Sequence, residues 1–444
     1  MKKFLQLMVL AGAMLAGAQL ASAAEHTKCE NCKFYVPEFA IQKGETKLVT
    51  LCLDNPDFVP TAYQIGLYFR GGLKLVEYID EEGLYLDGTF MATDRIKSRN
   101  TPFVTLNGNW KEDEKTHEMF FAMVGANMKQ TPVKENSGAL YEFYVTTDET
   151  FGTTDEKPSI AVNEDFTMTA TLEGHYPQCF ANTVYEARPL SEVLVADKAY
   201  AIADPVKVVA RTASPIDGNY FAFLSDGKDN WVKVNVPESS ADMFVEGKSY
   251  DGEQFYGQVS GFNPEFAIIK TLSNEDAVTP VEAEPVPHLM TSTLSFKPNE
   301  VVSIKGFYFK EEAEENLRAY SGQSGERGQS LIINNIWAGD LGFENGKQYN
   351  ISKGVVQLKA AWEKVDAPAL IKPSDDLAFQ NYVIYPFEKT GIATGVEDVN
   401  ADKTISSVRY YNVAGVESAT EFEGVNLVVT TYTDGTTSTV KVVK

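Results

Sequence analysis

The chain has 444 residues and a formal net charge of −23, from 39 basic and 62 acidic side chains. Phosphate backbones and anionic membrane surfaces repel a polyanion of this kind, so the composition disfavours nucleic acid and membranes as partners. At ~100–200 residues per domain, the length predicts three or four domains, each large enough for its own core.

The first 23 residues are typical of a secretory signal peptide. A positive start at Lys2 and Lys3 precedes an apolar stretch, and Ala21-Ser22-Ala23 fits the small-x-small rule of signal peptidase. A membrane anchor is the alternative, but no further stretch of membrane-spanning length follows. We therefore expect cleavage after Ala23 and an exported mature chain that is not inserted into a membrane.

Four cysteines lie in this exported chain, namely Cys29, Cys32, Cys52 and Cys179. An even number in an oxidising compartment predicts one or two structural disulfides, and the sequence leaves all three pairings open. Cys29-x-x-Cys32 has the spacing of a redox pair, but such pairs begin a helix, whereas this one runs into strand-like sequence. A zinc site, the other alternative, would need further ligands from the few histidines.

Residues 24–189 have the pattern of a β-sandwich. Apolar and polar side chains alternate in short runs, and clusters of Gly, Asn, Asp and Pro separate these runs. Short strands at this spacing predict a sandwich or a barrel. The strand-like runs are 48–53, 62–69, 103–106, 120–124 and 140–145. In the whole chain a helix is expected only at Lys310–Tyr320 and, as a second candidate, at Asp87–Ser98.

Residues 200–272 and 300–372 contain an internal repeat. Both copies have a strand, the motif Gly-Lys-x-Tyr, a second strand and an x-Pro-x-apolar segment. The motif is Gly247-Lys248-Ser249-Tyr250 in the first copy and Gly346-Lys347-Gln348-Tyr349 in the second. A unit of ~70–80 residues made of short strands has the size of a small five-stranded barrel, so the order predicts a duplicated barrel.

Two linkers complete the division of the chain. Residues 277–299 carry Pro280, Pro285 and Pro287 among acidic residues, which is the chemistry of an extended linker. Residues 390–404 are rich in Gly, Asp, Asn and Thr. The predicted domains are therefore a sandwich at 24–189, barrels at 190–276 and 300–389, and a C-terminal domain at 405–444.

The first domain resembles a known family in its fold pattern. Residues 33–175 contain a β run at Phe34 to Ala40, the turn Lys43-Gly44-Glu45, a strand and turn at 48–56, and a strand at Ala62 to Phe69. This order resembles the cohesin-like sandwich, whose members present a flat β face to a partner, in the well-studied cases a dockerin. No diagnostic contact residue is present, so none is carried over, and a generic immunoglobulin-like sandwich is the alternative.

The two repeats resemble the OB-fold-like domains found in exported proteins of Bacteroidota. Some OB folds bind oligonucleotides on a basic, aromatic strand face. Acidic residues outnumber basic ones in 195–270, so the resemblance here implies glycan binding, protein binding or a spacer role.

The last 40 residues carry the most specific pattern. A strand and turn at Ser407 to Gly415 are followed by the strand 424–429, the hairpin turn Asp434-Gly435 and a basic tail that ends at Lys444. This resembles the C-terminal sorting domain of type IX secretion cargo. It implies a small antiparallel sandwich and the type IX secretion machinery as a partner. The upstream Pro-Asn-Pro strand of the longer family form is missing, so a working sorting signal stays open.

The sequence contains no recognisable catalytic or metal-binding constellation. His26, His117, His175 and His288 include no two at metal-ligand spacing on one element, and no nucleophile elbow, phosphate loop or dinucleotide fingerprint occurs. The acidic segment 398–402 lacks the central Gly and distant Glu of a calcium loop. We therefore predict no enzymatic activity, no cofactor and no metal.

Trp110 and Trp337 are the best candidates for a ligand-binding side chain, because each follows an Asn-rich turn at a loop edge. Packing in a core is the alternative for both, and it is the expectation for Trp231 and Trp362.

Taken together, the sequence predicts an all-β chain: a cohesin- or immunoglobulin-like sandwich, two small OB-like β-barrel domains and a small C-terminal β-sandwich. The predicted function is non-enzymatic binding or adhesion, in which a β face of the sandwich recognises a protein or a glycan. The expected location is the medium or the outer cell surface, with the periplasm as an intermediate or alternative. A carbohydrate-binding accessory protein and a structural surface component without a small ligand are the alternative functions.

Overall fold

The computed structural model describes most of the chain beyond residue 26. The described ranges are 27–57, 59–78, 81, 89–97, 104–113, 118–126, 132–153, 155–165, 167–170, 174–213, 218–240, 242–272, 279–280, 284–289, 296–312, 316–321, 330–333, 341–358, 382–391, 405–433 and 437–443. The expected leader with its cleavage site at Ala23 lies outside these ranges. No helix in the described part has the length and hydropathy that a membrane crossing needs.

The prediction of an all-β chain is confirmed. Strands dominate the described ranges, and their helical elements are short: α2 (Leu190–Val193), η1 (Glu238–Ser240) and η2 (Gly252–Gln254). The chain divides into two compact units. Unit 1 comprises Met1–Pro285, Phe296–Val301 and Val355–Asp375, and unit 2 comprises Val286–Ser295, Val302–Gly354 and Asp376–Lys444.

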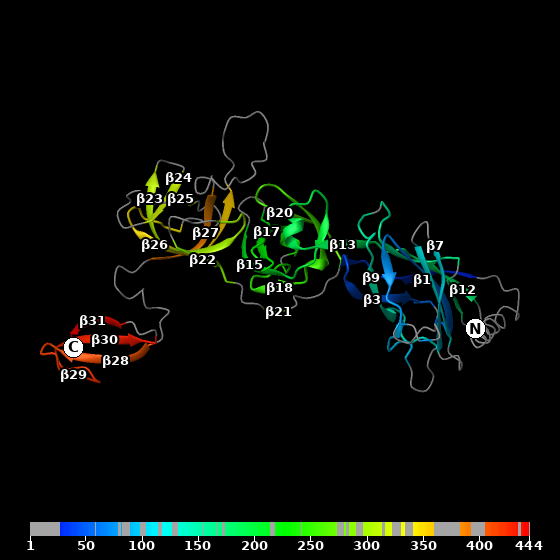
Figure 1. Cartoon of the computed structure of the whole chain (residues 1–444), viewed down its shortest axis with the longest axis horizontal. Helices are drawn as coiled ribbons and strands as arrows, with labels where there is room; N and C mark the ends of the chain where they lie inside the picture. Colours follow the sequence, from blue (N-terminus) through cyan, green and yellow to red (C-terminus); the bar gives the residue numbers. More distant parts are fainter. Residues whose placement is uncertain are drawn as a thin grey trace, which may run out of the picture. The chain divides into compact units, whose positions relative to one another are not determined.

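The first domain is an 11-stranded sheet folded over one core (Figure 1). Its main strand order is β5-β9-β3-β1-β12-β11-β4-β8-β7, and β10 and β6 pair with β4 and β9. The strands are β1 (Thr27–Tyr35), β3 (Thr46–Asp54), β4 (Ala62–Arg70), β5 (Leu73–Leu75), β6 (Met91–Ala92), β7 (Val104–Asp113), β8 (Glu118–Ala126), β9 (Ala139–Thr147), β10 (Ser159–Val162), β11 (Met168–Ala170) and β12 (Gly174–Cys179).

Alternation along the strands places the core of this sandwich. On β4, every second residue from Tyr63 to Phe69 is fully buried, as the period of two predicts. Phe69 meets Phe143 of β9 edge to face, and the hydroxyl groups of Tyr63 and Tyr141 are hydrogen-bonded. Because β4 and β9 are far apart in the sheet order, these contacts show that the sheet closes into two facing layers.

The first barrel belongs to a 10-stranded sheet in the same unit. Its order is β2-β13-β14-β19-β20-β17-β16-β15-β18-β21. The strands are β2 (Phe39–Gln42), β13 (Val184–Arg188), β14 (Tyr200–Ile202), β15 (Val206–Ala213), β16 (Tyr220–Ser225), β17 (Trp231–Val236), β18 (Lys248–Tyr250), β19 (Phe255–Ser260), β20 (Glu265–Thr271) and β21 (Thr279–Pro280). Since β2 and β13 come from the segment expected in the sandwich, one sheet continues from that domain into the barrel.

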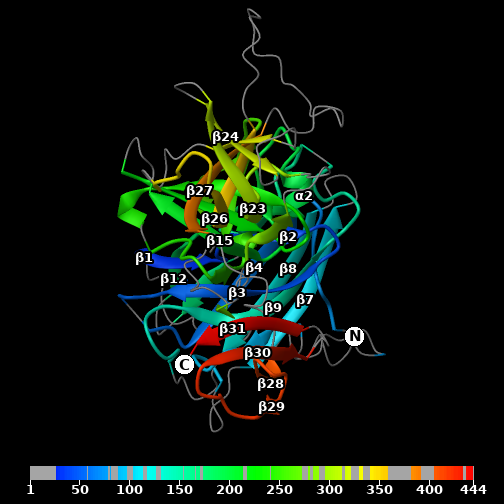
Figure 2. The ribbon, with the colours of Figure 1, turned by 90° about the vertical axis from the view of Figure 1, so that its left-hand side faces the viewer.

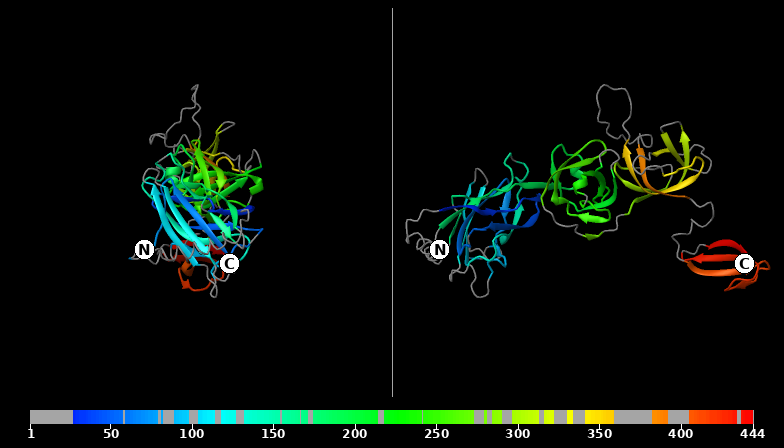
Figure 3. Two further views of the ribbon diagram at one scale, coloured as in Figure 1. Left: turned by 90° about the vertical axis from the view of Figure 1, so that its right-hand side faces the viewer. Right: turned by 180° about the vertical axis from the view of Figure 1, so that it is seen from behind.

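The second barrel has the order β22-β23-β24-β25-β27-β26, and a further pairing of β23 with β26 closes the ring. Figure 3 shows this part of the chain in yellow and orange. Its strands are β22 (Val286–Leu289), β23 (Val301–Glu312), β24 (Asn316–Ser321), β25 (Ser330–Ile333), β26 (Gln348–Leu358) and β27 (Tyr382–Gly391). The third and fifth strands are parallel in both barrels, β17 with β20 and β25 with β27. The two barrels therefore share one five-stranded topology, as the repeat predicts.

The repeated motif makes the same bonds in both barrels. The backbone N–H of Gly247 donates to the Val208 carbonyl, and that of Gly346 donates to the Phe309 carbonyl, both at 2.9 Å. Each glycine has a positive φ, 77° and 83°, which an L side chain rarely adopts. The motif tyrosine accepts a backbone N–H five residues back, at 2.9 Å in each copy. The motif thus fixes one turn against the first barrel strand.

Both helix predictions are wrong in the described residues. Of the segment Lys310–Tyr320, residues 310–312 and 316–320 lie in two antiparallel strands, with Glu312 paired to Asn316, because pairing with neighbouring strands outweighs the local helix propensity. The segment Asp87–Ser98 contains β6 and a single turn, in which the N–H groups of Ile96 and Lys97 donate to the Thr93 carbonyl. Part of the expected Pro-rich linker, β22, also joins the second barrel beside β23.

The C-terminal region is a four-stranded sheet of order β29-β28-β30-β31 (Figure 2). Its strands are β28 (Ile405–Asn412), β29 (Glu417–Ser418), β30 (Val425–Tyr432) and β31 (Thr437–Val443). Asn412 shapes the first turn, since its Oδ1 accepts the N–H groups of Ala414 and Val416. Asn426 is fully buried and bonds both backbone groups of Phe422. The described residues here form one layer.

Candidate binding surface

The two tryptophans chosen from the sequence do not define a site. Trp110 lies in β7 at a β-bulge, since Asn109 pairs with Phe121 while Lys111 pairs with Phe120. Its side chain and the whole of Trp337 lie outside the described part of the structure. Of the two tryptophans expected in cores, Trp231 is 5% exposed, and Trp362 lies outside the described ranges.

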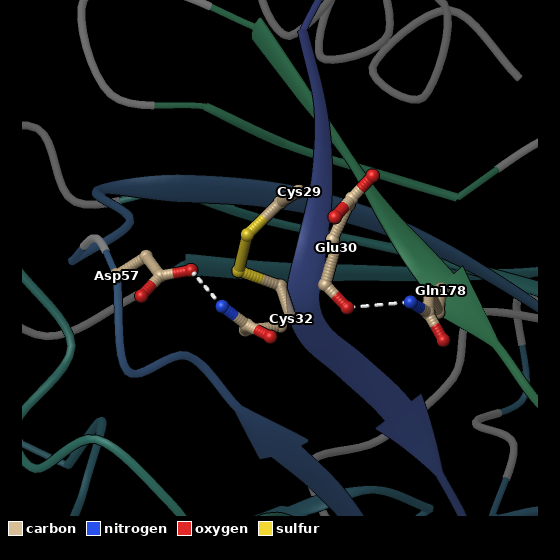
Figure 4. The surroundings of a disulfide bond; sticks show 6 residues. Cys29, Glu30, Cys32, Asp57 and Gln178 are labelled. Atoms are coloured by element: carbon tan, nitrogen blue, oxygen red, sulfur yellow. Dashed lines mark hydrogen bonds between the residues drawn. A yellow bond between two sulfur atoms is a disulfide. The ribbon is translucent and has the colours of Figure 1, made fainter.

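Cys29 and Cys32 form a disulfide within β1 (Figure 4). The register of β1 against β12 passes from Cys29 opposite Pro177 to Lys33 opposite Gln178, so the disulfide closes a bulge of the strand. Around it, Asn31 Nδ2 donates to Asp57 Oδ2 (2.8 Å), and the Gln178 side chain donates to the Glu30 carbonyl. The pair lies on a strand, without the helix N-terminus that lowers a thiol pKa.

Cys52 and Cys179 are free thiols on opposite faces of one sheet. Cys179 is in register with Phe34 and packs against the core beside it. Cys52 lies between the core residues Leu51 and Leu53 and therefore faces the other way. Two cysteines on opposite faces cannot be bridged without moving the backbone.

Neither thiol is activated. Burial raises the pKa of Cys179 to about 11. A hydrogen bond with Thr167 lowers this pKa by a smaller amount, and the charge of Glu164 raises it further. Burial also raises the pKa of Cys52, against the lowering effect of the Thr50 hydroxyl. With raised pKa values, both thiols are protonated at neutral pH, and the thiolate, which is the reactive form, is scarce.

An apolar stripe crosses the outer face of the sandwich. Leu48 on β3 lies directly opposite Tyr144 on β9, and the N–H of Val76, just past β5, donates to the Tyr144 carbonyl (2.8 Å). The strand neighbours Val49 and Phe143 belong to the core, so Leu48 and Tyr144 point away from it. We call Val76, Tyr144 and Leu48 the apolar stripe.

The apolar stripe is open to solvent and has a polar frame. Leu48 is 44% exposed, and the other two members are half-buried. Thr46 and Thr146 form the next pair on one side, and Thr50 and Glu142 form the next pair on the other. An apolar centre with a polar rim is the usual make-up of a protein–protein contact surface.

One lysine beside the stripe is already neutralised. Lys74 on β5 lies opposite Thr146 and pairs with Asp148 at 3.3 Å. Burial alone would raise the pKa of Asp148, but hydrogen bonds from the side chain and backbone of Thr150 and from Lys74 outweigh it and lower this pKa. Asp148 is therefore ionised at neutral pH and holds Lys74, and Glu142 places a carboxylate next to the stripe.

The described residues contain no group of three His, Cys, Asp or Glu side chains placed to hold a metal ion. Of the four histidines, only His288, on β22, has a described side chain. Sequence reasoning missed the apolar stripe. The alternation of residues in 48–53 and 140–145 places Leu48 and Tyr144 at outward positions. This pattern alone does not predict that no other element covers the outer face.

No protein-family model matches the chain, and no curated protein matches it in sequence. Solved structures similar to part of it are cohesin domains. A type I cohesin from a cohesin–dockerin complex of Clostridium thermocellum is 12% identical, with a TM-score of 0.26, over 37% of this chain and 99% of that one. The seventh ScaB type I cohesin of Pseudobacteroides cellulosolvens is 14% identical, also at 0.26, over 37% and 98%.

A non-cellulosomal cohesin from the archaeon Archaeoglobus fulgidus is 12% identical, with a TM-score of 0.22, over 35% of this chain and 91% of that one. The similarity concerns backbone arrangement, and no ligand or contact residue is transferred from it.

Proposed function

We propose that this chain is an exported, non-enzymatic binding protein that holds a protein partner on the apolar stripe of its sandwich. The observation that carries the proposal is an apolar row from Leu48 on β3 through Tyr144 on β9 to Val76 just past β5, partly open to solvent and flanked by threonines and Glu142. Exposed apolar patches that are rimmed by polar residues mark interaction sites on protein surfaces. The row lies on a sheet, whose backbone is already fixed, so binding costs little ordering of the surface.

Export is part of the same proposal. The leader at residues 1–23 and the resemblance of 405–444 to a type IX sorting domain support transport to the cell surface or the medium of a member of the Bacteroidota. The periplasm is the alternative location. Mass spectrometry of the mature protein from host fractions tests this: we expect a start at Ala24 and loss of the tail near Thr404. An intact Lys444 in the periplasm contradicts type IX sorting.

The binding test compares two matched variants of the mature chain. Leu48→Asp puts a charge into the stripe, and Val195→Asp changes an apolar residue that is even more exposed, 85%, outside the sandwich. Partners are cross-linked on the host surface, purified and titrated against each variant. We expect Leu48→Asp to weaken binding at least about tenfold, because a desolvated carboxylate would face the partner's apolar surface. Val195→Asp should bind like the wild type.

Other outcomes decide between the alternatives. If both variants bind the partner equally well, the partner does not bind at the apolar stripe. Binding on a glycan array that Leu48→Asp leaves unchanged supports a carbohydrate-binding accessory protein. A chain that captures nothing on the host surface, in either form, supports a structural surface component.

A further inference from the structure

The sandwich and the first barrel are joined by more than a linker. Strand β13 is parallel to β2 on one side and to β14 on the other, so hydrogen bonds run without a break from the sandwich segment into the barrel. Three small buried residues, Ala40, Ala187 and Ala201, lie one on each of these strands and pack together. We call this contact the junction.

Side chains brace the junction at two places. Lys270 of the barrel pairs with Glu38 just before β2, and the rings of Tyr185 and Tyr256 lie 4.4 Å apart between centroids. At the second place, Lys47 of β3 pairs with Glu253 of the short helical turn η2. The turn η2 contacts both β2 and β14, so Glu253 is held at the point where the two domains meet.

The position of Glu253 is set by close backbone packing. Its neighbour Gly252 leaves no room for a side chain, since a Cβ there would lie 2.4 Å from the Asp204 carbonyl oxygen and 2.5 Å from that of Ile202. The Asp251 carboxylate accepts the Glu253 N–H at 3.1 Å and so caps the turn. The Glu253 side chain itself is only 11% exposed.

The charges around Glu253 are unbalanced. One cation, Lys47, faces it, while Glu45 and Asp251 are two further carboxylates near the same place. On β2 and β14, the strands that η2 contacts, Tyr200 is the one titratable side chain. Burial raises the pKa of Glu253 to about 7; Lys47 lowers it, and Glu45 and Asp251 raise it further. Burial and the like charges therefore outweigh the ion pair.

We propose that Glu253 is a proton-dependent brace, which holds the sandwich and the first barrel together when it is protonated and loosens the junction when it ionises. In an opened junction Glu253 is solvated and has its ordinary acidity, near 4.5. A group whose pKa is higher in the closed state stabilises that state fully when the pH is below the group's ordinary pKa. This stabilisation is lost as the pH rises towards the higher pKa of the closed state. The loss occurs between about pH 4.5 and pH 7. A slightly acidic medium would thus hold the two domains in one fixed arrangement.

Hydrogen exchange of the full mature chain tests the brace. Protection of the β13 and β14 amides, corrected for intrinsic exchange, is measured at pH 5.5 and pH 8, with β16 and β17 as the internal reference. We expect protection at the junction to be about thirtyfold lower at pH 8, since each unit of pKa shift is a factor of ten in the closing equilibrium and about one and a half units of the shift lie above pH 5.5. The reference strands should change little.

Three variants separate the brace from general effects of pH. Glu253→Gln should keep the junction protected at both pH values. Lys47→Met should deepen the loss at pH 8, because ionised Glu253 then has no cation. Glu265→Gln, on the same barrel and paired with Lys233 at 2.7 Å, is the matched control and should behave like the wild type. Better protection at pH 8 than at pH 5.5, or an unchanged pH dependence in Glu253→Gln, would overturn the proposal.

Discussion

The two barrels have the same strand order and the same turn motif, but they fill their interiors differently. In the first barrel, Phe244, Tyr250 and Phe255 of β19 pack against one another, and β15 contributes the aliphatic Val206 and Val208. The fourth strand thus adds an aromatic ring to the two that precede it, while the first strand adds aliphatic side chains to the core.

In the second barrel the first strand carries the aromatic volume. Phe309 stacks on Phe343 with ring centroids 5.2 Å apart, and Phe307 contacts both Phe343 and Tyr349. The backbone frame set by the Gly-Lys-x-Tyr turn is conserved between the copies, while the filling is redistributed. Cores tolerate such exchanges when total volume is kept, which explains why the repeat is clear in its order and weak residue by residue.

The largest difference between the barrels should appear at their first strands. Val208 and Phe309 are matched, since the carbonyl of each accepts the N–H of the motif glycine. Phe309→Ala should lower the free energy of unfolding of the second barrel by about 3–5 kcal/mol. Val208→Ala should cost the first barrel about 2 kcal/mol. Hydrogen exchange of β24 and of β16 reports each barrel separately. Equal costs would contradict the redistribution of volume.

Two glycines give the next largest contrast. A Cβ at Gly257 would lie 2.3 Å from the Ala267 carbonyl oxygen, whereas a Cβ at Gly354 would lie 3.2 Å from that of Tyr385. Gly257→Ala should therefore destabilise the first barrel by about 2–3 kcal/mol, and Gly354→Ala should cost the second about 1 kcal/mol or less. Urea titration followed by limited proteolysis measures both. The reverse order would mean that the fourth strand of the second barrel is the tighter one.

The motif tyrosines should behave alike. Tyr250→Phe and Tyr349→Phe each remove a hydroxyl that accepts a backbone N–H at 2.9 Å, and both tyrosines are buried. Each change should cost about 1 kcal/mol, because an N–H loses its partner in a partly buried place. Thermal unfolding of the two variants, followed barrel by barrel, checks this. A clear inequality would show that the turn is not equivalent in the two copies.

The smallest effect is a response of the first barrel to acid. Burial would raise the pKa of Asp204, but Lys228 and the N–H of Leu190 outweigh it and lower this pKa. This interaction stabilises the fold fully at pH values above 3.8, the ordinary pKa of an aspartate. The stabilisation is lost as the pH falls through the lowered pKa that Asp204 has in the folded protein. Asp204→Asn should remove this acid sensitivity, a change of less than about 1 kcal/mol because Lys228 is exposed. Hydrogen exchange of the β14 amides, compared between pH 5 and pH 3, measures this acid sensitivity.

The sequence was informative where a local pattern determines structure. Alternation of apolar and polar residues predicted the strands of the sandwich. The Gly-Lys-x-Tyr motif predicted the duplicated barrels, because a positive φ and a tight turn are local requirements. The helix at 310–320 was wrong because strand pairing overrode local propensity. The Pro-rich segment was expected to be a linker, but part of it forms the strand β22. Proline is tolerated in a strand at the edge of a sheet, where its missing N–H is not needed for pairing.

The apolar stripe and the junction depend on long-range pairing. Leu48 and Tyr144 become neighbours only through the register of β3 with β9, across almost 100 residues of sequence. The continuous sheet from β2 to β14 likewise joins segments far apart in the chain. A period of two tells which residues share a face, but it contains no information about register or about which face stays open.

A hydrogen-exchange footprint of the mature chain with its captured partner tests whether the partner binds at the apolar stripe. Slower exchange confined to the backbone around Leu48, Tyr144 and Val76, and absent with Leu48→Asp, is the result predicted for binding at the apolar stripe. A footprint on the barrels or on the C-terminal sheet, with the stripe unchanged, would contradict it.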